Sequence, residues 1–201
     1  MSSYKVYLPQ LCKQEYTLTL DLLKKHKFDC DLHPGFNYHG SPPINAHLKI
    51  AFAAKELKNW RHQDKKILTG FDLIVKNFEL ESALRGGFAF SLGLKKNDKY
   101  DIDLKNVLKD EPDQMVRARL KLCTREITII EHDTVYGSAL LAPAFAAALA
   151  QANSGLIFEG EFFKQSNVMS EFLPIDSDIE DMNEDEDEDD GLKPNFFKSW
   201  S

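Results

Sequence analysis

Runs of alternating or β-branched residues predict four strands spread along the chain. Residues 4–8 alternate polar and apolar side chains and stop at Pro9, which cannot donate a hydrogen bond to a sheet. Residues 67–80 and 125–131 are rich in β-branched and aromatic side chains, which favour strands. Residues 156–158 are apolar and directly follow a glycine, so we expect a short closing strand there.

Two further strands are predicted from a glycine pair and from the alternation of charge. Gly86 and Gly87 favour a loop over residues 82–87, which would join the strand at 67–80 to another at 88–94. Residues 116–123 alternate apolar with basic side chains. They predict a strand with one basic face, formed by Arg117, Arg119 and Lys121.

Helical spacing predicts two helices in the first third of the chain. Residues 14–28 carry apolar side chains and end in a lysine-rich turn, which suits a helix C-terminus. Residues 48–62 repeat apolar side chains at roughly helical spacing, and Asn45 is placed to cap them. The first turns of this segment, residues 47–52, also alternate like a strand, so both interpretations stay open.

An Ala-rich segment, residues 134–152, is apolar on almost every side and predicts a buried helix. Asp133 is placed to cap its start, and Pro143 either kinks it or begins a second helix. Gly155 is expected to end it in a left-handed conformation.

These elements together predict an α+β fold, with a largely antiparallel sheet and helices packed mainly on one face. The chain has 201 residues, of which 43% are hydrophobic, and this is enough for one domain with a proper core. A strand, a buried helix and a closing strand occur near both ends of the chain, an order that is compatible with two ferredoxin-like halves.

Charge divides the chain into three parts. Residues 171–190 hold 12 of the 32 carboxylates and no lysine or arginine, whereas the whole chain has a net charge of −7. We therefore predict a globular body at 1–170, an acidic flexible arm at 171–190 and an aromatic docking segment at 191–201. Core-forming residues are expected before about residue 165, because a polar acidic run buries too little area to offset the entropy of ordering it.

The arm and its tail are the predicted partner-binding region. Exposed aromatic side chains make good anchors in a pocket, and the tail could dock on the body, on a second copy or on a partner. The arm could also fold back onto the predicted basic strand face. The predicted partner-binding residues are Glu184, Asp185, Glu186, Asp187, Glu188, Asp189, Asp190, Phe196, Phe197 and Trp200.

Several classes of protein are disfavoured by the sequence. No apolar run approaches the length of a membrane span, and the first residues do not resemble a secretory signal. The three cysteines are odd in number and widely spaced, as expected of reduced thiols in the cytoplasm. The chain lacks the glycine-rich and nucleophile motifs of nucleotide-binding proteins and hydrolases, so no cofactor is expected.

Two groups of residues could carry chemistry. Cys30, His33 and His39 lie within ten residues and offer zinc-ligand atoms, although their spacing matches no strong zinc pattern. Glu131 and His132 stand beside Asp133, but adjacent residues of a strand point to opposite faces and cannot all converge. We expect neither a catalytic nor a metal site from them.

One segment resembles a known group of proteins. Residues 131–161, EHDTVYGSALLAPAFAAALAQANSGLIFEGE, resemble the closing helix and strand of small cytoplasmic bacterial proteins. In those proteins an Ala-rich helix runs into a Gly-Leu/Val-Ile-Phe/Tyr-Asp strand, and this chain has Glu159 at the Asp position. Many of them are immunity proteins or neighbours of secreted toxins in interbacterial competition. The resemblance implies a toxin-neutralising binder and transfers no catalytic residue.

The sequence therefore predicts a non-enzymatic, cytoplasmic immunity protein. Its expected partner is a cognate toxin whose basic active-site cleft receives the acidic arm; neither nucleic acid nor a membrane is expected as a partner, and self-association stays open. One alternative is a hydrolytic or metal-dependent enzyme that uses the Cys30/His33/His39 or the Glu131/His132 region. Another is an acidic-tailed chaperone or adaptor for a basic client.

Overall fold

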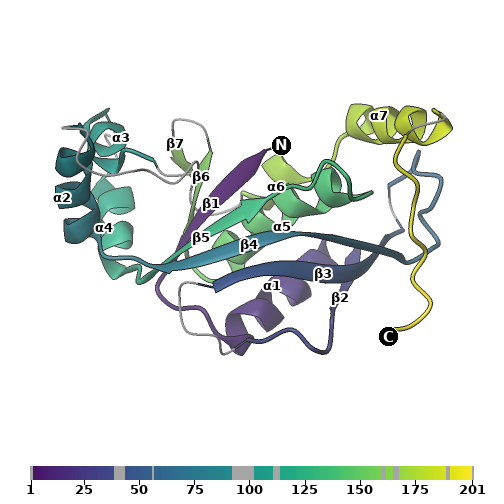
Figure 1. Cartoon of the computed structure of the whole chain (residues 1–201), viewed down its shortest axis with the longest axis horizontal. Coiled ribbons are helices and arrows are strands. Elements are labelled where there is room, and N and C mark those ends of the chain that lie inside the picture. Colours follow the sequence, from purple (N-terminus) through teal and green to yellow (C-terminus); the bar gives the residue numbers. More distant parts are fainter. Residues whose placement is uncertain are drawn as a thin grey trace.

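The fold is α+β, as the sequence predicts, and is built on one seven-stranded antiparallel sheet (Figure 1). The strand order is β2-β3-β4-β5-β1-β6-β7, so the strands form one continuous sheet and not two separate halves. The computed structural model describes residues 2–38, 44–55, 57–91, 102–110, 114–159, 162–164, 168–188 and 191–200.

The first strand of the chain lies inside the sheet and organises it. β1 (Ser3–Leu8) pairs on one side with β5 (Arg125–Ile130) and on the other with β6 (Leu156–Glu159). All three segments were predicted to be strands, and this prediction is confirmed. The short β7 (Phe162–Lys164) pairs with β6 at the edge of the sheet.

The other half of the sheet is a long hairpin with one added strand. β3 (Ile44–Ala54) and β4 (Ile67–Asn77) pair from Ile44↔Val75 to Phe52↔Ile67, and β2 (Phe28–Leu32) adds to the outer side of β3. The helix predicted for residues 48–62, with Asn45 as its cap, is therefore wrong. The apolar residues of this segment fit both the helical and the strand period, and the long pairing with β4 stabilises the strand.

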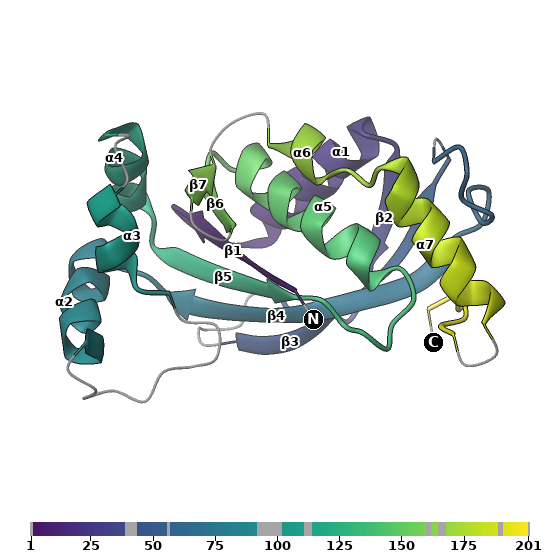
Figure 2. The ribbon, with the colours of Figure 1, turned by 90° about the horizontal axis from the view of Figure 1, so that it is seen from above.

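Two helices cover one face of the sheet (Figure 2). α1 (Lys13–Lys25) packs beside α5 (Ser138–Ala152), whose side chains are almost all buried, as its apolar sequence predicts. Pro143 lies inside α5. The predicted cap at Asp133 is wrong, because the helix begins only after Gly137, which has a φ of 79°.

The turn after α5 also differs from the prediction. Ser154, and not Gly155, takes the left-handed conformation, with a φ of 53°. Gly155 is instead required for space, since a Cβ there would lie 2.5 Å from the carbonyl oxygen of Tyr7 and 2.4 Å from Cδ2 of Leu8.

Three helices at one end of the molecule surround a second, smaller core (Figures 1 and 2). They are α2 (Leu80–Ser91), α3 (Leu104–Asp110) and α4 (Gln114–Leu122). The predicted hairpin through residues 82–94 is wrong for its described part, which is helical to Ser91. None of the described helices is long and apolar enough to cross a membrane.

The predicted strand at 116–123 is also wrong, because this segment forms α4. Val116 and Leu120 are buried, whereas Leu122 is 69% exposed. Residues 116 and 120 share a face in both a strand and a helix, so the alternation did not distinguish the two. The basic residues consequently do not form one strand face: Arg117 and Lys121 lie one helical turn apart, and Arg119 lies on another side.

Candidate functional site

The acidic run of the sequence forms a helix that packs on the body, at the end opposite α2–α4 (Figure 1). α7 (Asp176–Asp187) follows the short α6 (Met169–Phe172). Ile179 is only 2% exposed and belongs to the main core, together with Phe172 of α6. The expectation that all core-forming residues lie before about residue 165 is therefore wrong.

Polar side chains complete the contact between α7 and the body. Both oxygens of Asp187 accept hydrogen bonds from Arg61 at 2.5 Å, and this guanidinium holds the pKa of the Asp187 carboxyl below its usual range. Nε2 of His62 lies 2.9 Å and 3.0 Å from the two oxygens of Glu186. The side-chain amide of Asn183 donates to the carbonyl oxygen of Asn59 at 2.9 Å.

The spacing of these contacts explains why the helix forms. Ile179, Met182, Asn183 and Glu186 follow the i, i+3, i+4, i+7 pattern of a single helix face. At the start of the helix the backbone N–H of Ile175 donates to the Asp178 carboxylate at 2.8 Å. This pattern is present in the sequence, but the density of carboxylates around it conceals it.

The outer face of α7 presents carboxylates to solvent. Within the described part of the chain, no basic side chain pairs with the exposed carboxylates of this face. Asp176, Glu180 and Glu184 repeat at i, i+4 spacing with Asp181 beside them, and Glu188 follows directly after the helix. This arrangement is a fixed row of negative charge on a helix whose opposite face is anchored.

The C-terminal tail continues from α7 back to the sheet. The N–H of Leu68 donates to the carbonyl oxygen of Asn195 at 2.7 Å, and the N–H of Phe197 donates to that of Lys66 at 2.9 Å. The tail thus pairs with the start of β4, beyond the residues that β5 covers. One of the predicted docking surfaces, the body of the same chain, is the one seen in the structure.

The aromatic residues of the tail lie against basic side chains. The ring of Phe196 is 39% exposed and lies between His62, at 5.1 Å, and the ammonium group of Lys65, at 4.6 Å. Trp200 contacts the ring of His33 at 5.0 Å and that of Phe197 at 4.7 Å. These contacts hold the tail across the end of the sheet.

The predicted partner-binding carboxylates therefore have different surroundings. Glu184 and Glu188 are exposed, whereas Glu186 and Asp187 face His62 and Arg61 of the body. The side chain of Asp185, and Asp189 and Asp190 as a whole, lie outside the described residues. The arm does not fold onto the predicted basic strand face, because α4 and α7 lie at opposite ends of the molecule (Figure 1).

Of the two regions considered for chemistry, the one around Cys30 has little that favours a metal or catalytic site. Cys30 is buried, and burial raises the pKa of its thiol, which disfavours the thiolate that binds metals. Nδ1 of His33 accepts a hydrogen bond from the N–H of Gly35 at 3.0 Å. His39 lies outside the described residues.

Glu131 and His132 point to different neighbours, as expected for adjacent residues. Glu131 accepts a hydrogen bond from the Tyr4 hydroxyl at 2.8 Å. Nε2 of His132 lies 3.0 Å from Oδ1 of Asp72, and Nδ1 of His47 lies 3.1 Å from the same oxygen. Burial alone would raise the pKa of the Asp72 carboxyl, but the two imidazoles outweigh that effect and hold it below its usual range.

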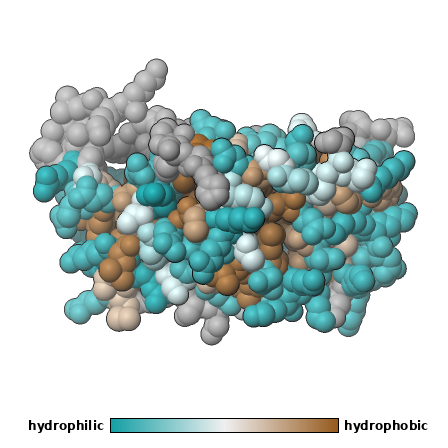
Figure 3. Space-filling view, turned by 90° about the horizontal axis from the view of Figure 1, so that it is seen from below, coloured by the Kyte–Doolittle hydropathy of each residue, from teal (hydrophilic) through white to brown (hydrophobic). Residues whose placement is uncertain are grey.

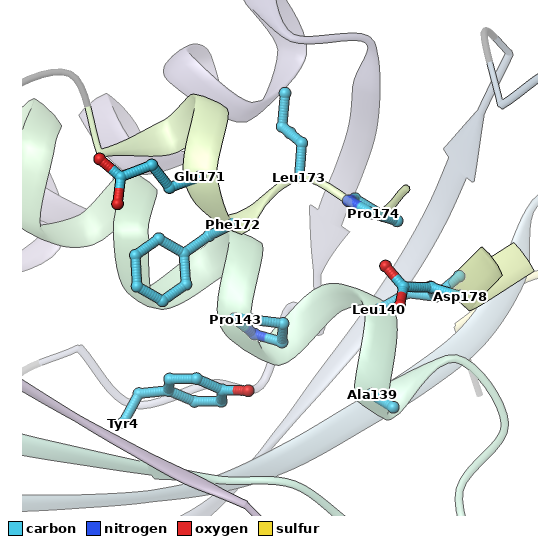
Figure 4. A pocket seen from close by; sticks show the side chains of 9 residues that line it. All are labelled: Tyr4, Ala139, Leu140, Pro143, Glu171, Phe172, Leu173, Pro174 and Asp178. Atoms are coloured by element: carbon cyan, nitrogen blue, oxygen red, sulfur yellow. The ribbon is translucent and has the colours of Figure 1, made fainter. Parts of the chain in front are cut away.

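A pocket of about 230 Å³ lies between β1, the start of α5 and the segment that leads into α7 (Figure 4). Its apolar walls include Tyr4, Pro143 and Phe172, and the Tyr4 and Phe172 rings meet edge to face at 6.1 Å. Both carboxylates at the pocket have partners: Glu171 pairs with Lys164, and Asp178 caps α7. The pocket is thus a small hollow at the base of the acidic helix, lined by both apolar side chains and paired carboxylates.

Comparisons of the chain with protein-family models, with curated proteins and with solved structures found no significant match.

Proposed function

We propose that this chain is a non-enzymatic immunity protein that binds and occludes a secreted toxin in the cytoplasm. The outer face of α7 would enter a basic cleft of the toxin. The observation that carries the proposal is the row of exposed carboxylates on a helix whose inner face is fixed to the body by Ile179, Arg61 and His62.

A fixed row of charge suits this task better than a free arm. Residues at i, i+4 spacing follow one another at about 6 Å along a helix, and α7 spans about 18 Å. A basic cleft that receives a polyanionic substrate would meet several carboxylates at once, and the row would not have to be ordered on binding. The attraction would also speed encounter, which matters when a toxin must be captured before it acts.

The face of the molecule away from α7 bears on whether a partner could bind there through apolar contacts. Figure 3 shows that the face of the molecule seen from below is mostly hydrophilic, with hydrophobic residues in separate smaller areas. A large continuous apolar patch on this face would have favoured an interface led by hydrophobic burial there.

Capture of partners by the full tagged chain tests the proposal. In a matched variant, Asp176, Glu180, Asp181, Glu184 and Glu188 are replaced by Asn or Gln, and the carboxylates that hold α7 in place are kept. We expect the wild type to capture a basic protein that arrests growth when produced alone and is harmless when produced with this chain. The variant should lose both capture and protection, mainly through slower association.

Two outcomes would contradict the proposal. Equal capture of the toxin by wild type and variant would remove α7 from the interface. A captured partner that does not affect growth would instead favour an adaptor for a basic client.

A further inference from the structure

Three side chains that can bind metals meet on the face of the sheet that α1 and α5 leave uncovered: His47 of β3, Asp72 of β4 and His132 just after β5. His47 lies opposite Asp72 in the pairing of β3 with β4, and Asp72 lies opposite Ile130 in the pairing of β4 with β5. His132 is two residues beyond Ile130, the last residue of β5, and its Nε2 lies 3.0 Å from Oδ1 of Asp72. One ligand atom of each of His47, Asp72 and His132 lies within 4.8 Å of the other two. Among the described residues, this is the only group of three or more His, Cys, Asp or Glu side chains that meets this distance.

The two distances to Asp72 fit a shared ion. Nδ1 of His47 and Nε2 of His132 lie 3.1 Å and 3.0 Å from Oδ1 of Asp72. Two ligands bound at about 2.1 Å are about 3.0 Å apart at a right angle and about 3.4 Å apart at a tetrahedral angle. The imidazole rings stand nearly perpendicular to each other, at 88°, with their centroids 4.9 Å apart.

Nε2 of His132 supplies a second observation. This atom is buried, and its short contact with Asp72 does not have the geometry of a hydrogen bond. The atom therefore has an ion-pair partner in Asp72 but no aligned hydrogen bond, and an ion shared with Asp72 would satisfy it. The main chain of the same residue is held in place, because its N–H donates to the buried Ser138 hydroxyl at 3.0 Å.

The surroundings leave room for the ring of His47 and for water. A Cβ on Gly70 would lie 2.3 Å from Nε2 of His47, so the imidazole lies across β4 at a position that only glycine allows. His47 and Asp72 also line a surface hollow of about 320 Å³ with Asn45 and Ile74. Further coordination positions of an ion here would face solvent.

We propose that His47, Asp72 and His132 bind one divalent transition-metal ion of the zinc class. Two imidazole nitrogens and one carboxylate oxygen come from the protein, and water completes the coordination. Imidazole ligands favour zinc and its neighbours over Mg²⁺ and Ca²⁺, which prefer sites made only of oxygen. The site lies on β3, β4 and the end of β5, so it is independent of the toxin-binding role proposed for α7.

Calorimetric titration of the chelator-treated full chain with ZnCl₂ tests the site, with MgCl₂ as the contrasting ion. We expect one equivalent of Zn²⁺ to bind, with no comparable heat from Mg²⁺. His47→Gln, Asp72→Asn and His132→Gln should each weaken zinc binding by at least about tenfold. His33→Gln, which changes a histidine outside the cluster, should bind zinc as the wild type does.

A second measurement does not depend on the folding of the variants. In NMR spectra of the wild type, Zn²⁺ should shift the imidazole signals of His47 and His132 and leave those of His26 and His33 in place. Zinc should also raise the melting temperature of the wild type. Absence of zinc binding, or binding that persists undiminished in all three folded variants, would overturn the proposal.

Discussion

Glycine positions show, at the scale of single residues, how closely the main chain of β6 approaches β1. Gly155 precedes β6 and lies against Tyr7 and Leu8, at a point where its neighbour Ser154 takes the left-handed turn. The sequence assigned the left-handed turn to Gly155, but in the structure Ser154 provides the turn and Gly155 provides the space.

Gly155→Ala should therefore destabilise the fold. The added methyl group would meet the carbonyl oxygen of Tyr7, which cannot move without disturbing the pairing of β1 with β6. Overpacking of this kind costs about 1–3 kcal/mol, which lowers the melting temperature of a chain of this length by about 3–10 °C. Thermal unfolding measures the effect.

Ser154→Gly is the matched control. It removes a left-handed non-glycine residue and should leave the melting temperature unchanged or slightly higher. If Gly155→Ala melted with the wild type, the close approach of the two strands would not be a constraint on the fold.

At the scale of elements, α7 combines unfavourable local charge with favourable tertiary contacts. Eight of its twelve residues are acidic and none is basic, so like charges one turn apart oppose the helix. Burial of Ile179 and the contacts of Arg61 and His62 with Glu186 and Asp187 favour it. The Arg61–Asp187 pair is exposed and contributes little, so the burial of Ile179 is the stronger of these two contacts.

Ile179→Ala should release α7 from the body. The loss is about 2 kcal/mol, the lower end for a buried isoleucine, and corresponds to a roughly 30-fold rise in amide hydrogen exchange within α7. Exchange in α5 should not change, because only the docking of α7 is affected. Ile175 is 65% exposed, so Ile175→Ala serves as the control and should leave exchange in α7 as it is. Equal exchange in both variants would show that Ile179 does not anchor the helix.

At the scale of the whole molecule, a single sheet carries two different ends. α2–α4 enclose a second core at one end, and α7 with the C-terminal tail covers the other (Figure 2). The segment after residue 170 contributes to the stability of that end. Phe172 and Ile179 are buried in the main core, and Asn195 accepts a hydrogen bond from Leu68 of β4. The division into body, arm and docking segment stays a prediction.

Truncation after Ser170 tests that division. It removes the buried side chains of Phe172 and Ile179, each of which contributes about 2 kcal/mol, so the melting temperature should fall by about 10 °C. Truncation after Glu188 removes only the tail and should have a smaller effect. If the first truncation melted within about 3 °C of the full chain, residues 171–201 would be a separable arm, as the sequence alone predicts.

The sequence by itself determined the elements in which one period dominates. The strands predicted at 4–8, 67–80 and 125–131 and the buried Ala-rich helix at 134–152 all occur. The second of these strands ends earlier than predicted, at Asn77, and the helix begins later. These elements bury one face or all faces, so the hydrophobic pattern of each is compatible with only one type of secondary structure. Together they determine the α+β class.

Only the tertiary structure decided the segments in which two patterns coexist. Residues 44–54 become a strand because β4 offers a long partner, and residues 116–122 become a helix because Val116 and Leu120 face the second core. The acidic run becomes a docked helix because the body receives Ile179 and pairs two of its carboxylates. The cluster of His47, Asp72 and His132 depends on the register of three strands. These residues lie far apart in the chain, and hydrogen bonding between strands, which no local pattern encodes, brings them together.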